Sequence, residues 1–332
     1  MNLYEQQSAN RRRTWLVMFA FVAFLFLLGL GFDAFYLGSA GGIAPIGSLL
    51  ALGVGSVSAL VSYFTGDRAV LLASGAKPIA EVAASASEAD KLKLRQLDNV
   101  VDEMAIAAGV PRPPVYIVPD GDPNAFATGR GPGHSSIAVT RGLLDALDRE
   151  ELQGVVAHEM SHVRNLDVRL MTIVAALVGG VALLSDWARR GMWWGGGSRR
   201  RSHDGDRGGG IGGVLFFILW LVAILLAPLL AQLLAMMVSR QREYLADASG
   251  AELTRNPIGL AQALEKIDAA VAPTQAINHG SAHLCIADPL GRQMNVMEGF
   301  VSDLFASHPP MAARIAALKQ MAFQERPRPA RG

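Results

Sequence analysis

Long apolar runs alternate with polar stretches along this sequence. Four apolar runs stand out, at about residues 15–37, 43–64, 170–187 and 211–238. A helix needs about 20 apolar residues to cross the ~30 Å hydrocarbon core of a bilayer, and the third run is short for that purpose. We expect about four transmembrane helices, of which the first two form a hairpin over residues 15–64.

Charges beside the apolar runs predict their orientation. The arginines at 11–13 precede the first run, and positive charge favours the cytoplasmic side of a membrane. Residues 1–14 would then be a cytoplasmic tail, and two crossings would return residues 65–169 to the same side. The Arg/Gly-rich loop 188–210 conflicts with this rule, because it would lie outside if both later runs span. The first run could also be a cleaved signal peptide, although a second run so close behind it favours a hairpin.

The polar stretch between the second and third runs carries the signals of a small mixed domain. Helical periodicity predicts an amphipathic helix over 88–108, which Gly109 would end. Asp148, followed three residues later by Glu151, is typical of the start of a second helix. Short segments bounded by turn residues predict strands at 115–118, 124–128 and 137–140. The expected fold class is α+β, mainly helical with a small sheet, fused to the transmembrane helices.

Composition supports a membrane protein and excludes some functions. Charged residues make up 18% of the chain and hydrophobic residues 51%, whereas soluble domains carry about 25% charge. The net charge of +1 lacks the basic excess expected of a protein that binds nucleic acid. Cys285 is the only cysteine, so an intramolecular disulfide is impossible and a metal would have to be held by His, Asp or Glu.

The strongest chemical motif lies in the helix that Asp148 begins. His158 and His162 are four residues apart, so both rings project from one face of a helix and can reach one metal ion. Glu159 lies beside them, and it could take a proton from a water that zinc activates and pass it to a leaving amine. This is the arrangement that a peptide hydrolase needs. The string alone arises by chance in on the order of one chain in a hundred, but its helical, apolar setting strengthens it.

A third ligand must come from elsewhere in the chain. Glu243 follows the fourth apolar run and could supply an oxygen ligand, while Asp247, one turn later, could accept a hydrogen bond from a ligand histidine. The spacing also allows a solvent-exposed helix that carries both residues as surface charges. Packing of the third and fourth runs would bring the two motifs together at the membrane surface. His308 could donate to the oxyanion of the tetrahedral intermediate, or it could merely cap the helix that follows it.

With these residues identified, the chain resembles the HtpX family of bacterial membrane zinc endopeptidases, relatives of the CAAX prenyl proteases. The resemblance covers most of the chain and rests on four motifs in matching order: residues 124–129, His158 to His162, Ser239-Arg240 with Glu243 and Asp247, and His308-Pro309-Pro310 followed by Arg314. It implies a gluzincin-like peptidase domain formed from residues 65–169 and 239–332. It also implies that one zinc ion per chain is held by His158, His162 and Glu243.

The resemblance further implies a substrate site and a cellular role. Asn124, Ala125 and Phe126 resemble the family's substrate-side strand, to which an extended peptide could bind by strand addition. The implied role is cleavage of damaged or misassembled membrane proteins at the bacterial inner membrane, with the active site on the cytoplasmic side. The alternatives are a prenyl-protein processing protease and a membrane scaffold without activity. A transporter is disfavoured, because no ionisable residue lies well inside the apolar runs. The oligomeric state stays open.

Overall fold

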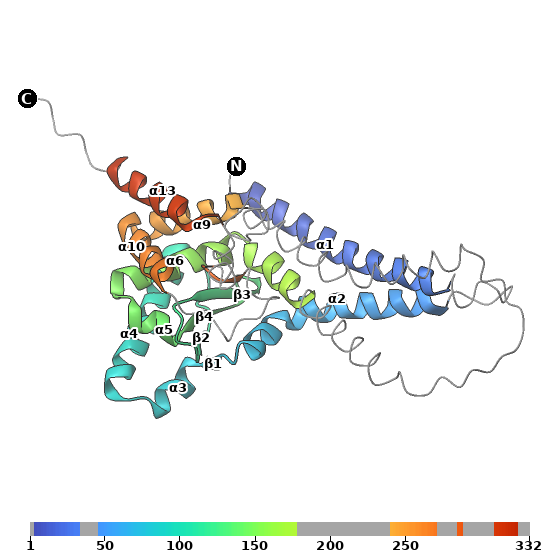
Figure 1. The fold of residues 1–332 in the computed structure, drawn as a ribbon, viewed down its shortest axis with the longest axis horizontal. Coiled ribbons are helices and arrows are strands. Elements are labelled where there is room, and N and C mark those ends of the chain that lie inside the picture. The colour runs from blue at the N-terminus through green and yellow to red at the C-terminus, as the bar shows by residue number, and fades with distance from the viewer. Residues whose placement is uncertain (1–2, 34–45, 178–239, 271–283, 288–308, 325–332) are drawn as a thin grey trace, which may run out of the picture.

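The computed structural model describes residues 3–33, 46–177, 240–270, 284–287 and 309–324 (Figure 1). An arm of two long helices, α1 (Leu3–Phe32) and α2 (Ile46–Ala73), extends from a compact part that contains a small sheet. The other elements are, in chain order, β1 (Lys77–Pro78), α3 (Ile79–Ser85), α4 (Glu88–Ala108), β2 (Val115–Val118), β3 (Ala125–Gly131), β4 (His134–Thr140), α5 (Arg141–Ala146), α6 (Arg149–Arg164), α9 (Arg240–Thr254), α10 (Pro257–Ala269) and α13 (Met311–Gln324). The expected class, mainly helical with a small mixed sheet, is confirmed.

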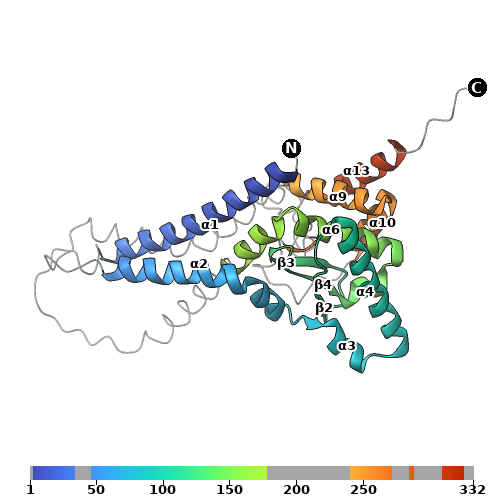
Figure 2. The ribbon, with the colours of Figure 1, turned by 180° about the vertical axis from the view of Figure 1, so that it is seen from behind.

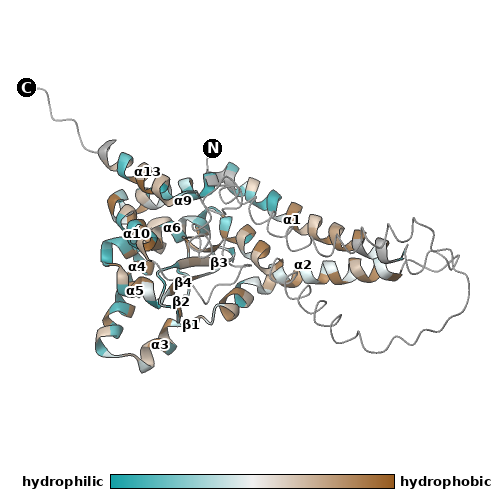
Figure 3. Cartoon of the chain, viewed as in Figure 1, coloured by the Kyte–Doolittle hydropathy of each residue, from teal (hydrophilic) through white to brown (hydrophobic). Residues whose placement is uncertain are grey.

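The arm is a helical hairpin in which the start of α1 is polar and most other residues are apolar (Figure 3). Among the described residues, α2 is the one helix that is long and apolar enough to cross a membrane. Leu49, Leu50 and Val57 of α2 are each more than half exposed. The helix α1 begins at Leu3, so the predicted tail of residues 1–14 is helical over most of its length. Most of the third and fourth apolar runs lies outside the described residues, and four transmembrane helices therefore stay a prediction.

Asp33 joins the two helices at the far end of the arm. Its carboxylate accepts hydrogen bonds from the backbone amides of Gly47 at 2.6 Å and Ser48 at 2.7 Å, and from the Ser48 hydroxyl at 2.7 Å. Amides in the first turn of a helix have no partner within that helix. Asp33 therefore caps α2 from the neighbouring helix, and this polar residue near the end of the first apolar run has a structural role.

The sheet has four strands in the order β1-β2-β4-β3. β2 and β4 are parallel, whereas β3 and β4 form an antiparallel hairpin in which Phe126 lies opposite Ala138. The hairpin contains a bulge at Gly129, where φ is +144° and a Cβ would lie 2.3 Å from the carbonyl oxygen of His134. The three predicted strands are confirmed. The order of strands leaves β3 at an edge of the sheet, packed against α6.

The helix α6 lies inside the compact part. Asp148 begins it as predicted: its carboxylate accepts from the amides of Glu150 and Glu151, each at 3.0 Å, and the Glu151 carboxylate accepts from the Asp148 amide at 2.8 Å. The helices α4, α9 and α10 pack around α6. Gly154 allows the closest of these approaches, because a Cβ there would lie 2.8 Å from Leu260 of α10. The histidine motif thus lies in the protein core.

Candidate metal centre

The two histidines of α6 lie one turn apart and face the same point. Their Nε2 atoms are 3.2 Å apart, and their ring planes are almost perpendicular, at 88°. Both residues are buried: His158 is 1% exposed and His162 is 3% exposed. The two ring nitrogens thus face one point that is shielded from water, and a metal ion bound there would stabilise this arrangement.

Glu243 reaches the same point from α9. Its carboxylate oxygens lie 3.6 Å from His162 Nε2 and 3.7 Å from His158 Nε2. One ligand atom from each of the three residues lies within 4.8 Å of the others, so the group could hold one ion. Gly250 permits this packing, because a Cβ there would lie 3.1 Å from the His158 backbone nitrogen. The alternative of a solvent-exposed helix is wrong, since Glu243 and Asp247 are both buried.

Asp247 lies against the first histidine, as its predicted role requires. Its Oδ1 is 3.0 Å from His158 Nδ1, which leaves Nε2 for a metal. Arg314 of α13 is fully buried and donates to the two oxygens of Asp247 at 2.7 and 2.8 Å. Burial raises the pKa of Asp247, but the Arg314 guanidinium outweighs burial and lowers that pKa to about 2. Asp247 is therefore charged at neutral pH and can fix the ring of His158 by a charge-assisted hydrogen bond.

Asp167 has the equivalent position at the second histidine, and the sequence motif did not reveal it. It is fully buried, and its Oδ2 lies 3.4 Å from His162 Nδ1. The helix α6 ends at Arg164 and Leu166 adopts a positive φ of 62°, and after this break in the helix Asp167 lies beside the ring. Burial lowers the pKa of His162, but Asp167 and Glu243 outweigh burial and raise it to about 9. The same anions would favour a metal cation.

Glu159 is buried in the same place, at 1% exposure. Neither of its carboxylate oxygens has a hydrogen bond of ordinary geometry within the described part of the chain. Burial raises the pKa of Glu159 above its usual value, against the opposing effect of the two histidines and of the nearby Ala127 amide. Such a carboxylate is a strong proton acceptor by comparison with an exposed one.

The strand predicted to bind substrate is already paired at one end. The Ile286 amide donates to the Ala125 carbonyl at 2.9 Å. The buried Asn124 side chain belongs to the same contact, because its amide nitrogen donates to the Ala287 carbonyl at 3.1 Å. Residues 284–287 therefore lie where an added strand would pair with this end of β3.

The next residues of β3 lead to the metal centre. Phe126 is 2% exposed and forms an isolated antiparallel bridge with Cys285. Alternation along a strand places the backbone groups of Ala127 on the same edge as those of Ala125, and the Ala127 amide is the one that faces Glu159. Ala127 is thus the strand residue best placed to meet a peptide at the centre. Substrate binding by residues 124–126 stays a prediction.

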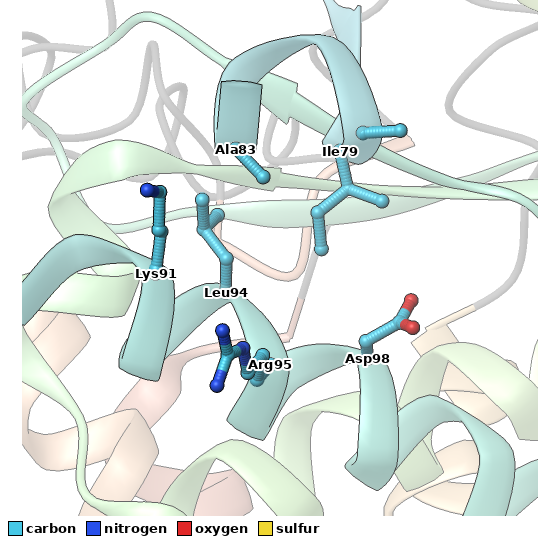
Figure 4. Close-up of a pocket in the computed structure, with 7 residues that line it drawn as sticks. Ile79, Ala83, Lys91, Leu94, Arg95 and Asp98 are labelled. Carbon is cyan, nitrogen blue, oxygen red and sulfur yellow. The ribbon is translucent and has the colours of Figure 1, made fainter. Parts of the chain in front are cut away.

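Two further features do not contribute to this centre. His308 lies outside the described residues, so its role at the oxyanion stays a prediction. A cavity of about 240 Å³ lies between α3 and α4 (Figure 4). It is lined by Ile79, Ala80, Ala83, Lys91, Leu94, Arg95 and Asp98, none of which belongs to the group of candidate ligands.

Comparison with known proteins agrees with this geometry. A model of peptidase family M48 matches residues 91–322, which include the three candidate ligands. The chain belongs to peptidase family M48. As an M48 peptidase it is a metallopeptidase, and the enzyme class expected from the histidine motif is confirmed.

Curated relatives of this M48 peptidase confirm the resemblance to the HtpX family. The Protease HtpX homolog of Caldanaerobacter subterraneus subsp. tengcongensis is 42% identical over 320 residues, which cover 96% of this chain and 98% of the relative. The Protease HtpX homolog of Lactiplantibacillus plantarum is 44% identical over 325 residues, which cover 96% of this chain and 100% of the relative. Among solved structures, the crystal structure of Ste24p from S. mikatae matches with 17% identity and a TM-score of 0.44, over 95% of this chain and 67% of that chain.

Proposed function

We propose that this M48 peptidase is a zinc-dependent endopeptidase that cleaves misfolded or damaged membrane proteins. The observation that carries the proposal is the buried Glu159 carboxylate, which lacks an ordinary hydrogen bond among the described residues and lies beside three converging ligand side chains. Burying such a carboxylate is costly for folding. A group of this kind, next to a set of metal ligands, is characteristic of a reacting residue.

Zinc fits the donor set. Two imidazoles and one carboxylate are three protein ligands, the number typical of catalytic zinc, with a fourth position left for the reaction. The ligand histidines each have a carboxylate at the other ring nitrogen, which fixes the tautomer. When bound, zinc would supply Lewis acidity to the scissile carbonyl and to the attacking water.

Glu159 would move the proton in the reaction. Its carboxylate accepts a proton from the attacking water and passes it to the nitrogen of the leaving amine. The raised pKa of Glu159 suits this exchange, because the carboxyl group must both accept and release a proton. The backbone of Ala127 would hold an extended peptide along the edge of β3, which aligns the scissile bond with Glu159.

The substrate class and the location are inferred from the position of the centre at the base of the arm. The start of α1 lies against the end of α6 (Figures 1 and 2). We propose four membrane spans in the bacterial inner membrane, with residues 65–169 and 239–332 forming the peptidase domain on the cytoplasmic side. A protein that protrudes from the bilayer would then be close to the centre. Such a substrate must enter as an extended, unfolded chain, because it binds along the edge of β3. Damaged proteins are therefore favoured as substrates over folded ones.

Zinc content and casein cleavage by the detergent-purified chain test this function. The wild type should hold one zinc per chain and cleave casein. Glu159→Gln should keep its zinc and lose cleavage, because an amide does not accept the proton, whereas Glu243→Ala should lose both. Zinc-free wild type, or full activity of Glu159→Gln, would contradict the proposal. Cleavage of casein, an unmodified protein, also distinguishes this activity from prenyl-protein processing.

A further inference from the structure

The N-terminal arm contributes a side chain to the surroundings of the metal centre. Asn10 of α1 is 2% exposed, and its amide nitrogen donates to Asp167 Oδ1 at 2.6 Å and to the Asn165 carbonyl at 3.0 Å. One turn earlier, Gln7 Nε2 donates to the Arg164 carbonyl at 2.9 Å. The first membrane helix is therefore bonded to the C-terminal end of the histidine helix α6 through side chains rather than through apolar packing alone.

Asp167 connects Asn10 to a candidate metal ligand. Its Oδ1 accepts from Asn10, and its Oδ2 lies 3.4 Å from His162 Nδ1. The two oxygens thus have different partners on opposite sides. A carboxylate held at one oxygen cannot rotate without losing that bond, so Asn10 fixes the orientation in which Asp167 meets His162.

Arg242 competes with His162 for the Asp167 carboxylate. Its guanidinium is buried, and none of its three nitrogens has a hydrogen bond of ordinary geometry within the part of the chain that the structure describes. Its Nε lies 3.7 Å from Asp167 Oδ1. A buried guanidinium that lacks hydrogen bonds gains strongly from a bidentate carboxylate. Without Asn10, Asp167 would turn toward Arg242 and away from His162.

We propose that Asn10 is a positioning residue for the metal centre, which keeps the Asp167 carboxylate on His162 and so sets the affinity for zinc. The inference rests on the proposed zinc-peptidase function and extends it to the first membrane helix. That helix precedes residues 91–322, the region that matches the family model. The arm is then a part of the peptidase site as well as an anchor.

Zinc affinity of the detergent-purified full chain, measured by competition with a chromophoric chelator, tests the role of Asn10. Asn10→Ala should weaken zinc binding about tenfold, the effect of losing one charge-assisted hydrogen bond behind a metal ligand. Ser8→Ala, at an exposed position of the same helix, should bind zinc like the wild type. Asn10→Asp keeps the size of the side chain but presents an acceptor to Asp167, so it should weaken binding at least as much, and it replaces Asn10→Ala if that variant is not recovered folded. Wild-type affinity in the Asn10 variants would overturn the inference.

A double-mutant cycle separates positioning from a general structural role. In an Asp167→Ala background, Asn10→Ala should cause no further loss of zinc affinity, because its effect passes through Asp167. The same tenfold loss in both backgrounds would overturn the inference. With Co²⁺ in place of zinc, Asn10→Ala should also shift the visible absorption of the metal, since the His162 ring is reoriented, and Ser8→Ala should not. Wild-type protein that binds no zinc would overturn the proposed function itself, whereas zinc-binding wild type with unaffected Asn10 variants overturns this inference alone.

Discussion

Each candidate ligand histidine has its own carboxylate on the ring nitrogen that faces away from the metal position. Asp247 holds His158, and Asp167 holds His162. The two carboxylates are themselves held differently. Asp247 accepts two hydrogen bonds from the charged Arg314 side chain, whereas Asp167 accepts one from the neutral Asn10 side chain. Orientation of the first ring therefore depends on α13, and orientation of the second depends on α1.

Asp247→Ala should weaken zinc binding by about 10–100-fold, because loss of a carboxylate behind a ligand histidine frees the ring and lowers its basicity. Competition with a chelator measures the change. Asp268→Ala, which removes an exposed carboxylate on α10, is the matched control and should bind zinc like the wild type. Equal affinities in the two variants would show that Asp247 does not support His158.

The ion pair of Asp247 with Arg314 should also make stability depend on pH in a defined window. The pKa of Asp247 falls from 3.8 to about 2 on folding, so its charged form stabilises the fold fully above about pH 4, and this contribution is lost as the pH falls through about 2. Thermal unfolding of the metal-free chain should show a smaller drop between pH 4 and 2 in Asp247→Asn than in the wild type. Identical drops would mean that the pair adds no stability.

Pairs of helices approach closely where a glycine faces another backbone. At Gly154 a Cβ would lie 2.8 Å from both the Cα and the backbone nitrogen of Leu260, and a backbone neighbour cannot move aside as a flexible side chain can. Gly154→Ala should therefore separate α6 from α10 and destabilise the fold by about 1–3 kcal/mol. Denaturant unfolding measures the loss. Gly53→Ala in α2, where nothing lies within 4 Å of the new Cβ, is the control and should be neutral or slightly stabilising, because alanine favours a helix more than glycine does.

The elements that local signals specify could be predicted from the sequence, and the resemblance implied the contact of Glu243 with the two histidines. Other contacts around the site could not be predicted. The capping box at Asp148 and the four-residue spacing of the histidines predicted α6 and its two candidate ligands. Asp167 escaped detection because it lies beyond the end of α6, after the turn at Leu166, where the periodicity of α6 no longer applies. The pairing of residues 284–287 with β3 joins segments that are far apart in the chain. The sequence of one short segment does not indicate which strand it will pair with.

Both helices of the arm reach the compact part at the same end of the arm. The helix α1 begins against α6, and α2 ends just before β1 of the sheet, so both ends of the hairpin lie at the compact part (Figures 1 and 2). Asp33, by contrast, caps α2 at the opposite end. If the hairpin crosses a bilayer, the N-terminus and the metal centre must lie on one side of it. The arginines at 11–13 favour the cytoplasm as that side.

Labelling of single cysteines with a membrane-impermeant maleimide should reveal this arrangement. Ser8→Cys at the start of α1 and Ser85→Cys at the end of α3 are both exposed and should react in inverted vesicles but not in spheroplasts. Ile46→Cys, at the far end of the arm and 49% exposed, should show the opposite pattern. The native Cys285 is buried and gives little background in folded protein. If position 8 reacted from the side opposite to position 85, α1 could not reach α6 in the membrane, and Asn10 could not bond Asp167. The labelling pattern therefore tests the hairpin and the contact that connects it to the metal centre together.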